Sequence, residues 1–384
     1  MHVHVVDPSA YTPPYDHALC RALGLAGADV DLYTSRFAYG PVAPAEGYAR
    51  RDFFYRASPG SAGSGIRRAA KLAQHVPDML RYRAAARRAD VVHFQWLAVQ
   101  HLDGYLLPTK RPLVLTAHDI LPREPRPGQR SAQRRLYDRF DAVVVHSEHG
   151  RVRLTEELGL DPARVHVIPH GVLRPWEDIP EPDGPEGGGN GAVALPVELR
   201  GIEGQVALFF GLLRPYKGLD ILLDAWRQSG LGSPGDRELW IVGMPRMDIA
   251  PLRAAAPPGV RFLPRFVYGK EILAVMRRAD LVVLPYREID QSGVVFTALG
   301  AGVPLLLSDV GGFPDVAATG AARTVRAGDP AALGEALSEL FGDPTALAAM
   351  TERSRAAVAQ EYAWERIAER TIALYDSLLE NVPR

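Results

Sequence analysis

The chain has 384 residues, of which 47% are hydrophobic and 23% are charged, and its formal net charge is −1. This length exceeds one ordinary hydrophobic core and predicts two domains. The balanced charge excludes a general electrostatic attraction to nucleic acid. The single cysteine, Cys20, excludes an internal disulfide framework and a cysteine-based zinc site. The chain begins without a signal-peptide layout, and no run approaches 18 apolar residues, so we expect a cytoplasmic protein.

Short apolar runs alternate with helical patterns along the first half of the chain. We expect strands at 2–6, 29–34, 90–95, 113–117, 142–146 and 165–168. We expect helices at 16–27, 66–87, 129–139 and 148–158. Continuous apolar strands that alternate with helices predict a parallel sheet covered on both faces.

The second half restarts the same rhythm. We expect strands at 206–210, 238–242, 260–263, 281–284 and 304–307. We expect helices at 217–229, 269–278, 293–301 and 330–341, followed by a helical segment without strands at 345–380. The fold class is therefore α/β, with two doubly wound Rossmann-like domains.

A stretch without periodicity separates the two halves. Residues 174–205 include the Pro- and Gly-rich run 180–191, which we interpret as a linker with a disordered insertion. It divides an N-terminal domain, 1–173, from a C-terminal domain, 206–358. We expect the last segment, 359–384, to be a helix that crosses back onto the N-terminal domain.

Two strand-to-helix junctions in the second half predict an anion site. An apolar strand ends at Gly211, and Arg214 and Lys217 stand in the loop before the next helix. A second buried strand, 281–284, leads through the polar turn 290–294 into another helix. Helix N-termini carry unpaired N–H groups and partial positive charge, so the added cations predict a phosphate or diphosphate ligand.

Five motifs that occur in register along nearly the whole chain point to one family. They are DVVHFQW at 90–96, TAHDI at 116–120, VHVIPHG at 165–171, FGLLRPYKG at 210–218 and QSGV at 291–294. Together they resemble the retaining glycosyltransferases of family 4, also called group 1. The resemblance implies a GT-B fold, in which two Rossmann-like domains face each other across a cleft.

The resemblance also implies an activity. Such an enzyme moves a sugar from a nucleotide diphosphate sugar to an acceptor hydroxyl of a glycan, a lipid-linked intermediate or a natural product. The donor binds mainly to the C-terminal domain and the acceptor mainly to the N-terminal one. No divalent metal or other cofactor is expected. The sequence leaves the base, the sugar, the acceptor and the oligomeric state open.

Site roles follow from the resemblance residue by residue. Arg214 and Lys217 would clamp the leaving diphosphate, His118 would face the transferred sugar, and Asp290 would keep a carboxylate near it. The residues implied in substrate binding are Asp119, Gly211, Phe266, Val267, Gln291, Ser292, Gly293, Val294 and Thr297. Among them, 292–294 would offer backbone N–H groups to phosphate or sugar, and the main chain at 266–267 would hold the base.

One departure from the family pattern concerns ribose recognition. The family has two glutamates eight positions apart, and here Asp290 and Ala298 stand at those positions. Alanine cannot bind the ribose hydroxyls, so Thr297 or backbone groups would have to. Ala298 also motivates the alternative of a non-catalytic nucleotide-sugar-binding subunit that supports a partner glycosyltransferase. An oxidoreductase is disfavoured because no strand precedes a Gly-x-Gly-x-x-Gly turn.

Three further patterns lie in the first quarter of the chain. His2 and His4 share one face of the first strand, but the sequence offers no third ligand beside them, so we predict no metal site. Asp29 and Asp31 are interpreted as acids at a sheet edge. Residues 66–88 form a basic, amphipathic segment, for which we keep both peripheral contact with the inner face of the membrane and a solvated helix face as interpretations.

Overall fold

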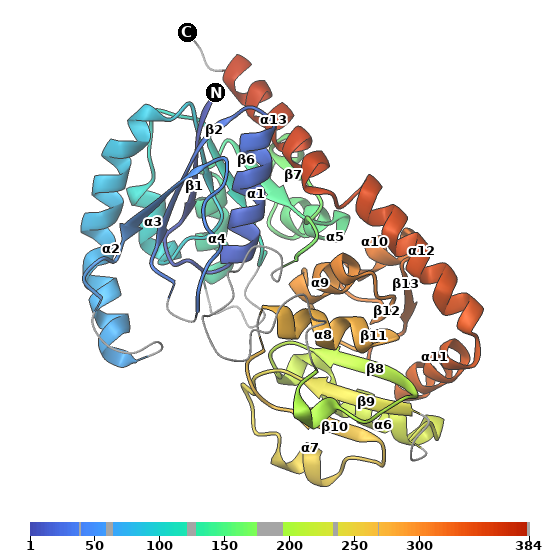
Figure 1. The fold of residues 1–384 in the computed structure, drawn as a ribbon. Helices are drawn as coiled ribbons and strands as arrows, with labels where there is room; N and C mark the ends of the chain where they lie inside the picture. Colours follow the sequence, from blue (N-terminus) through green and yellow to red (C-terminus); the bar gives the residue numbers. More distant parts are fainter. Residues whose placement is uncertain are drawn as a thin grey trace. The chain divides into compact units, whose positions relative to one another are not determined.

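The computed structural model describes residues 1–37, 40–58, 64–120, 128–174, 195–232, 237–267 and 269–381. The chain forms two compact units (Figure 1). The first contains Met1–Gly171 and Tyr362–Arg384, and the second contains Val172–Glu361. The predicted insertion at 180–191 lies outside the described residues.

The first unit is built on a seven-stranded parallel sheet in the order β3-β2-β1-β4-β5-β6-β7. Its strands are β1 (His2–Asp7), β2 (Asp29–Ser35), β3 (Ala49–Phe54), β4 (Val91–Phe94), β5 (Leu113–Thr116), β6 (Ala142–Val145) and β7 (Val165–Val167). The strand order reverses beside β1, because β2 and β3 extend to one side and β4 to β7 to the other. Both faces of β4 to β6 are buried, which accounts for their continuous apolar sequences.

Helices cover both faces of this sheet. They are α1 (Pro13–Leu25), α2 (Gly65–Ala85), η1 (Ala86–Arg88), α3 (Gln100–Leu106), α4 (Gln129–Tyr137), α5 (Glu148–Val152), the π-turn η2 (Arg153–Glu157), η3 (Pro162–Arg164) and α13 (Trp364–Glu380). On one face, Met79 and Tyr82 of α2 pack in the same core cluster as Phe94 of β4. On the other face, α13 packs against α1, and the Tyr375 hydroxyl lies 2.6 Å from Nδ1 of His93 (Figure 1).

The second unit contains a six-stranded parallel sheet in the order β10-β9-β8-β11-β12-β13. Its strands are β8 (Gln205–Phe210), β9 (Arg237–Val242), β10 (Val260–Leu263), β11 (Leu281–Leu284), β12 (Leu305–Ser308) and β13 (Ala322–Val325). Its helices are η4 (Val197–Leu199), η5 (Pro215–Lys217), α6 (Leu219–Ser229), α7 (Ala250–Ala254), α8 (Lys270–Arg278), α9 (Gly293–Ala301), α10 (Phe313–Ala318), α11 (Pro330–Gly342) and α12 (Pro344–Gln360).

The two doubly wound sheets predicted from the sequence are confirmed. The sequence analysis missed β3 and β13, which are edge strands, and the short helices α3, α7 and α10. It extended the helix before β7 to residue 158, where the structure has α5 followed by a π-turn. Within the described ranges, no helix is both long and apolar enough to cross a bilayer.

A close contact inside the first unit tests how α13 docks. A Cβ added at Gly171 would overlap the indole of Trp364, the first residue of α13. We therefore expect Gly171→Ala to lower the free energy of unfolding of this unit by about 1–3 kcal/mol through overpacking. Chemical denaturation followed by tryptophan fluorescence measures this loss.

Gly104→Ala is the matched control. Its added Cβ would meet only the Cδ1 of Leu136, at an ordinary contact distance of 3.5 Å, in the interior of α3. Alanine favours a helix over glycine by about 1 kcal/mol, so this variant should be as stable as the parent or more stable. Equal stability of Gly171→Ala and the parent would contradict the docking of Trp364 over Gly171.

Candidate functional site

The topology of each sheet marks one crevice for a ligand. In open parallel sheets, ligands bind outside the carboxyl ends of the strands where the strand order reverses. That point lies between β1 and β4 in the first unit and between β8 and β11 in the second. Both predicted junctions of the second half follow β8 and β11, so they meet at the second of these crevices.

Lys217 is the central cation of the crevice in the second unit. It closes the turn η5 after β8, and its side chain is buried, with 7% of the residue exposed. A Cβ built on Gly211 would lie 3.1 Å from both Lys217 Nζ and Val294 Cγ2. Lys217 Nζ also lies 4.9 Å from the centroid of the Tyr286 ring. The ammonium is thus held between the end of β8 and the start of α9.

The loops after β8 and β11 are fastened to each other. The backbone N–H of Arg287 donates to the carbonyl of Tyr216 at 2.8 Å, and its guanidinium donates to the carbonyl of Pro215 at 2.9 Å. Gly218 has φ +67° and lies so close to the carbonyl of Pro285 that any side chain would collide with it. These contacts fix the position of Lys217 before a ligand arrives.

Helix α9 places its N-terminus at the same crevice. Its N-cap is Ser292, and no side chain among the described residues caps it there. The Oε1 of Gln291 accepts from the Ser292 N–H at 3.2 Å. Thr297 is buried and its hydroxyl donates to the Gly293 carbonyl at 3.0 Å. The partial positive charge of this N-terminus therefore adds to that of Lys217.

The remaining predicted residues of this unit differ in their exposure. Arg214 is exposed at the start of η5. Asp290 is half-buried, and its carbonyl accepts from the Gly312 N–H at 3.2 Å. Phe266 is 49% exposed and its carbonyl accepts from Arg265, whereas Val267 is buried. Ala298, where the family has glutamate, is completely buried in α9.

In the first unit, a chain of neutral side chains crosses the carboxyl ends of the strands. Since the Ile168 carbonyl can only accept, Nδ1 of His146 donates to it at 3.0 Å. Nε2 of His146 then accepts from Nδ1 of His118 at 3.2 Å. This leaves Nε2 of His118 as an acceptor, 3.2 Å from the carboxamide of Gln95.

The carboxamide of Gln95 completes this chain. Its nitrogen has no partner among the described residues, while its oxygen faces the acceptor nitrogen of His118. The two ends of a carboxamide are nearly equivalent in shape, so the hydrogen bonds decide its orientation. Turning it over lets the nitrogen donate to His118. Burial, reinforced by His146 and His170, lowers the pKa of His118 well below its ordinary value, so this imidazole is neutral.

Two acids that the sequence analysis overlooked shape the loop after β1. The carboxylate of Asp7 accepts from the backbone N–H groups of Ser9, Tyr11 and Thr12. Burial, followed by the charge of Asp7, raises the pKa of Asp16 well above its ordinary value. Asp16 therefore carries the proton of its hydrogen bond to Asp7. The signal in the sequence was an acid at the end of β1, beside the reversal of strand order.

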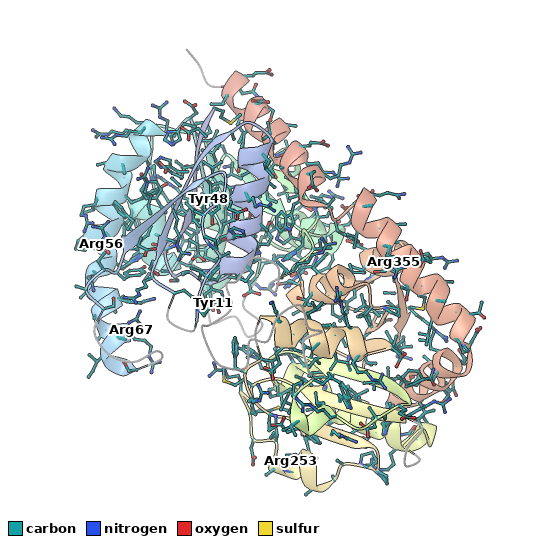
Figure 2. All side chains as sticks on the ribbon, viewed as in Figure 1. Tyr11, Tyr48, Arg56, Arg67, Arg253 and Arg355 are labelled. Atoms are coloured by element: carbon teal, nitrogen blue, oxygen red, sulfur yellow. The ribbon has the colours of Figure 1, made fainter. Side chains whose placement is uncertain are left out.

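An aromatic platform borders the same crevice. The Trp96 ring stacks on His118 with a centroid distance of 4.9 Å and an interplanar angle of 13°. Tyr11, 64% exposed, lies 4.4 Å from Trp96 between centroids, on the loop labelled in Figure 2. Trp96 Nε1 donates to the Thr12 hydroxyl at 3.0 Å. Asp119, next to His118, is exposed. Aromatic faces of this kind bind the apolar faces of sugars.

Comparison with known proteins matches each unit to a glycosyltransferase family. Residues 15–172 match the family described as Glycosyltransferase Family 4, and residues 204–343 match Glycosyl transferases group 1. A GDP-mannose:glycolipid 4-beta-D-mannosyltransferase of Xanthomonas campestris is 27% identical over 58% of this chain and 62% of its own length. A D-inositol 3-phosphate glycosyltransferase of Segniliparus rotundus is 28% identical over 60% and 53%. The matched region thus spans less than two thirds of these relatives.

Solved structures share the architecture across the whole chain. Sucrose-phosphate synthase of Thermosynechococcus elongatus has a TM-score of 0.73 at 18% identity, covering 100% of both chains. Anabaena Alr3699/HepE in complex with UDP-glucose has a TM-score of 0.68 at 17% identity, covering 98% of this chain and 100% of that one. At these identities the similarity establishes the fold, and with the two parallel sheets it confirms the predicted GT-B fold.

The neutral histidines make the stability of the first unit depend on pH. Burial lowers the pKa of His146 to about 4 and that of His93 to about 3, from 6.5. Below about pH 6.5 the unfolded chain takes up protons that the folded chain does not, so stability falls as the pH falls. Each histidine contributes a slope of up to about 1.4 kcal/mol per pH unit. Denaturant titrations between about pH 7 and pH 5 measure it.

A variant isolates the histidine contribution from that of Asp16. The raised pKa of Asp16 acts in the opposite direction, because its folded form retains a proton that the unfolded chain releases. We expect His146→Gln to flatten the pH dependence by up to about 1.4 kcal/mol per pH unit relative to the parent. The same slope in both proteins would show that His146 is not held neutral.

Proposed function

The chain belongs to the glycosyltransferases of group 1 and family 4, and we propose that it transfers a sugar from a nucleotide diphosphate sugar to an acceptor hydroxyl. The observation that carries the proposal is the burial of Lys217 between Gly211 and the N-terminus of α9. A cation and a helix N-terminus at one crevice suit a diphosphate.

In this proposal Lys217 and Arg214 stabilise the leaving diphosphate. Negative charge builds on this group as the glycosidic bond breaks, and fixed cations in a partly desolvated site stabilise it without reorganisation. Lys217 is buried and fastened by the loop contacts, whereas Arg214 is exposed and can close onto the ligand. Because these groups neutralise the diphosphate, we propose that transfer needs no divalent metal.

The donor sugar and nucleoside would take the rest of the crevice. Asp290 would receive hydroxyl groups of the sugar, and the backbone of 266–267 would hold the base. The ribose is the open point, because Ala298 is buried and the Thr297 proton is already donated to Gly293. We propose that the ribose is held by backbone groups, with at most an acceptor lone pair from Thr297.

The acceptor would bind at the crevice of the first unit. His118 is neutral, and both of its ring nitrogens are engaged, by His146 and Gln95. It would therefore orient a sugar by contact through its carbon edge and by its fixed position, without carrying a proton to or from it. The exposed Tyr11 ring beside Trp96 would stack on an acceptor sugar. The Xanthomonas relative is named for a glycolipid acceptor, and we propose a lipid-linked acceptor here.

Helix α2 supports a lipid-linked acceptor. Ile66, Leu72, Val76 and Leu80 are 70%, 58%, 38% and 51% exposed. At about 3.6 residues per turn they share about a third of the helix circumference. By the same spacing Arg68 and Arg81 border this stripe on its two sides, whereas Arg67, labelled in Figure 2, lies on the opposite side of α2. An exposed apolar stripe with basic borders suits peripheral binding to anionic lipid.

A donor panel with Lys217→Ala tests the clamp. The purified chain would be incubated in EDTA with UDP-, GDP-, ADP- and dTDP-sugars, with and without acceptors, and nucleotide release would be followed. We expect turnover with one donor and a loss of about 10²–10³ in rate in Lys217→Ala. Lys110→Ala, which removes an exposed lysine of the first unit, is the control and should keep the parental rate.

Two results would overturn parts of this proposal. Normal rate and donor affinity in Lys217→Ala would remove the clamp. Donor-induced thermal stabilisation without turnover on any acceptor would favour the non-catalytic subunit, an alternative that the transferase relatives do not favour. Turnover that appears only with added divalent metal would contradict metal independence.

The stereochemical course is read from the same reaction. We propose retention, so an α-linked donor should give an α-linked product, and the one-bond C1–H1 coupling constant of the product measures this. The name of the Xanthomonas relative specifies a β-linkage, which makes this measurement necessary. A β-linked product from an α-linked donor would replace retention by inversion.

Membrane binding through α2 is tested by vesicle flotation. We expect the chain to float with vesicles rich in phosphatidylglycerol and to remain below with phosphatidylcholine alone. Replacing Leu72 and Leu80 by serine should weaken partitioning at least about tenfold, because each buried leucine contributes about 1.5–3 kcal/mol. Leu25→Ser removes a leucine that is 72% exposed on α1 and should have no effect. Equal flotation of all variants would reject α2 as the contact.

A further inference from the structure

Strand pairing brings a third polar side chain to the two histidines of β1. His2 pairs with Asp29 and His4 with Asp31 across the parallel β1–β2 ladder. One potential ligand atom from each of His2, His4 and Asp31 lies within 4.8 Å of the others. The third ligand could not be recognised in the sequence, because the register of β2 against β1 is set by the fold.

The hydrogen bonds of His2 leave two acceptor atoms facing each other, and a cation would stabilise this contact. Nδ1 of His2 lies 3.0 Å from the carbonyl of Arg88, which can only accept, so Nδ1 carries a proton. In the neutral ring Nε2 is then an acceptor, yet it faces Oδ2 of Asp31 at 3.3 Å. Two acceptors in contact require a positive species between or upon them, either a proton on His2 or a metal ion.

His4 is the independent observation. It is completely buried, and its Nε2 has no hydrogen-bond partner among the described residues. A buried nitrogen without a partner is costly unless a ligand uses its lone pair. A metal ion binds the lone pair of an unprotonated imidazole nitrogen.

The surroundings hold these side chains in place. The backbone N–H of His2 donates to Asp90 at 2.7 Å. The Nε of Arg51 donates to Oδ1 of Asp31 at 3.0 Å, which leaves Oδ2 facing His2. The bond from His2 Nδ1 to a carbonyl is the outer-shell contact that metal-binding histidines make.

We propose that His2, His4 and Asp31 form a binding site for Zn²⁺, with water or Asp29 as the fourth ligand. Two imidazoles and a carboxylate suit zinc, whereas Mg²⁺ and Ca²⁺ prefer oxygen ligands. Asp29 is exposed, and its Oδ2 lies 4.0 Å from Nε2 of His2. This inference is independent of the proposed transfer reaction.

The site is structural and separate from the transfer crevice. It lies at the amino ends of β1 and β2, while Asp7 and the loop of the acceptor crevice lie at the carboxyl end of β1 (Figure 1). His4 and Asp7 are three residues apart along β1, which corresponds to about 10 Å. A metal ion there joins β1 to β2 and, through the Arg88 carbonyl, to η1.

Zinc binding by the full chain is the test. The chain would be purified with a C-terminal affinity tag, and the tag would then be removed so that it cannot bind zinc. Bound metal would be stripped with a chelator, and the chelator would be dialysed away. We expect isothermal titration with Zn²⁺ to give one site per chain, with a higher Tm. Co²⁺ in its place should give the strong visible absorption of a four-coordinate site. His2→Gln and Asp31→Asn should each weaken Zn²⁺ at least about tenfold, the lower limit known for outer-shell changes.

His149→Gln, a half-buried histidine on α5, is the matched control and should bind Zn²⁺ as the parent does. If a variant fails to fold, the Zn²⁺ titration of the parental protein still decides whether the site exists. Absence of stoichiometric Zn²⁺ binding in the parent would overturn the site. Unchanged Zn²⁺ affinity in both ligand variants would also overturn it.

Discussion

The burial of the Lys217 ammonium is the constraint on which the crevice of the second unit depends. A charged group in surroundings of low polarity interacts strongly with any anion that reaches it, because little water screens the field. The position is possible only because the β8 and β11 loops approach closely. Gly211 leaves room beside Lys217 Nζ, and Gly218 with φ +67° lets its backbone contact Pro285. A Cβ at Gly211 would crowd Lys217 Nζ, and a Cβ at Gly218 would overlap the Pro285 carbonyl, so both glycines are needed for the close approach that surrounds the lysine.

The crevice of the first unit depends on hydrogen-bond direction in a comparable way. One backbone carbonyl, that of Ile168, fixes the proton of His146, which fixes the proton of His118 and then the orientation of Gln95. Burial keeps these rings neutral, so the chain has only one arrangement of protons. Both ring nitrogens of His118 are engaged in hydrogen bonds and its pKa is lowered, so this side chain is held in one orientation. It defines the shape of the crevice and is poorly suited to proton transfer.

The sequence predicted what depends on local pattern and missed what depends on pairing. The bounds of β11 and α9 agree with prediction, because an apolar strand there ends in a polar turn that leads into the helix. The edge strand β3 was missed, since Arg51 and Asp52 are exposed and break its apolar character. Motif resemblance supplied Lys217 and His118. It could not supply Asp16, whose proton reaches Asp7 across a turn, nor Asp31, which meets His4 only through the register of two strands.

The carboxyl ends of the first sheet suit ligand binding, whereas the proposed zinc site lies at its amino ends. This separation determines how removal of metal should affect the protein. The carboxyl ends must stay open for ligands, so polar groups there are arranged around a crevice. The amino ends do not need to stay open for a ligand. A cation among His2, His4 and Asp31 would therefore affect only the stability of the unit. A loss of sugar transfer after chelation would therefore have two candidate origins. Measuring the activity of the chelated protein at several temperatures distinguishes them. Loss through the structural site should disappear at temperatures where the metal-free chain remains folded. Loss through a catalytic metal should persist at every temperature, because the chemistry itself would lack its charge.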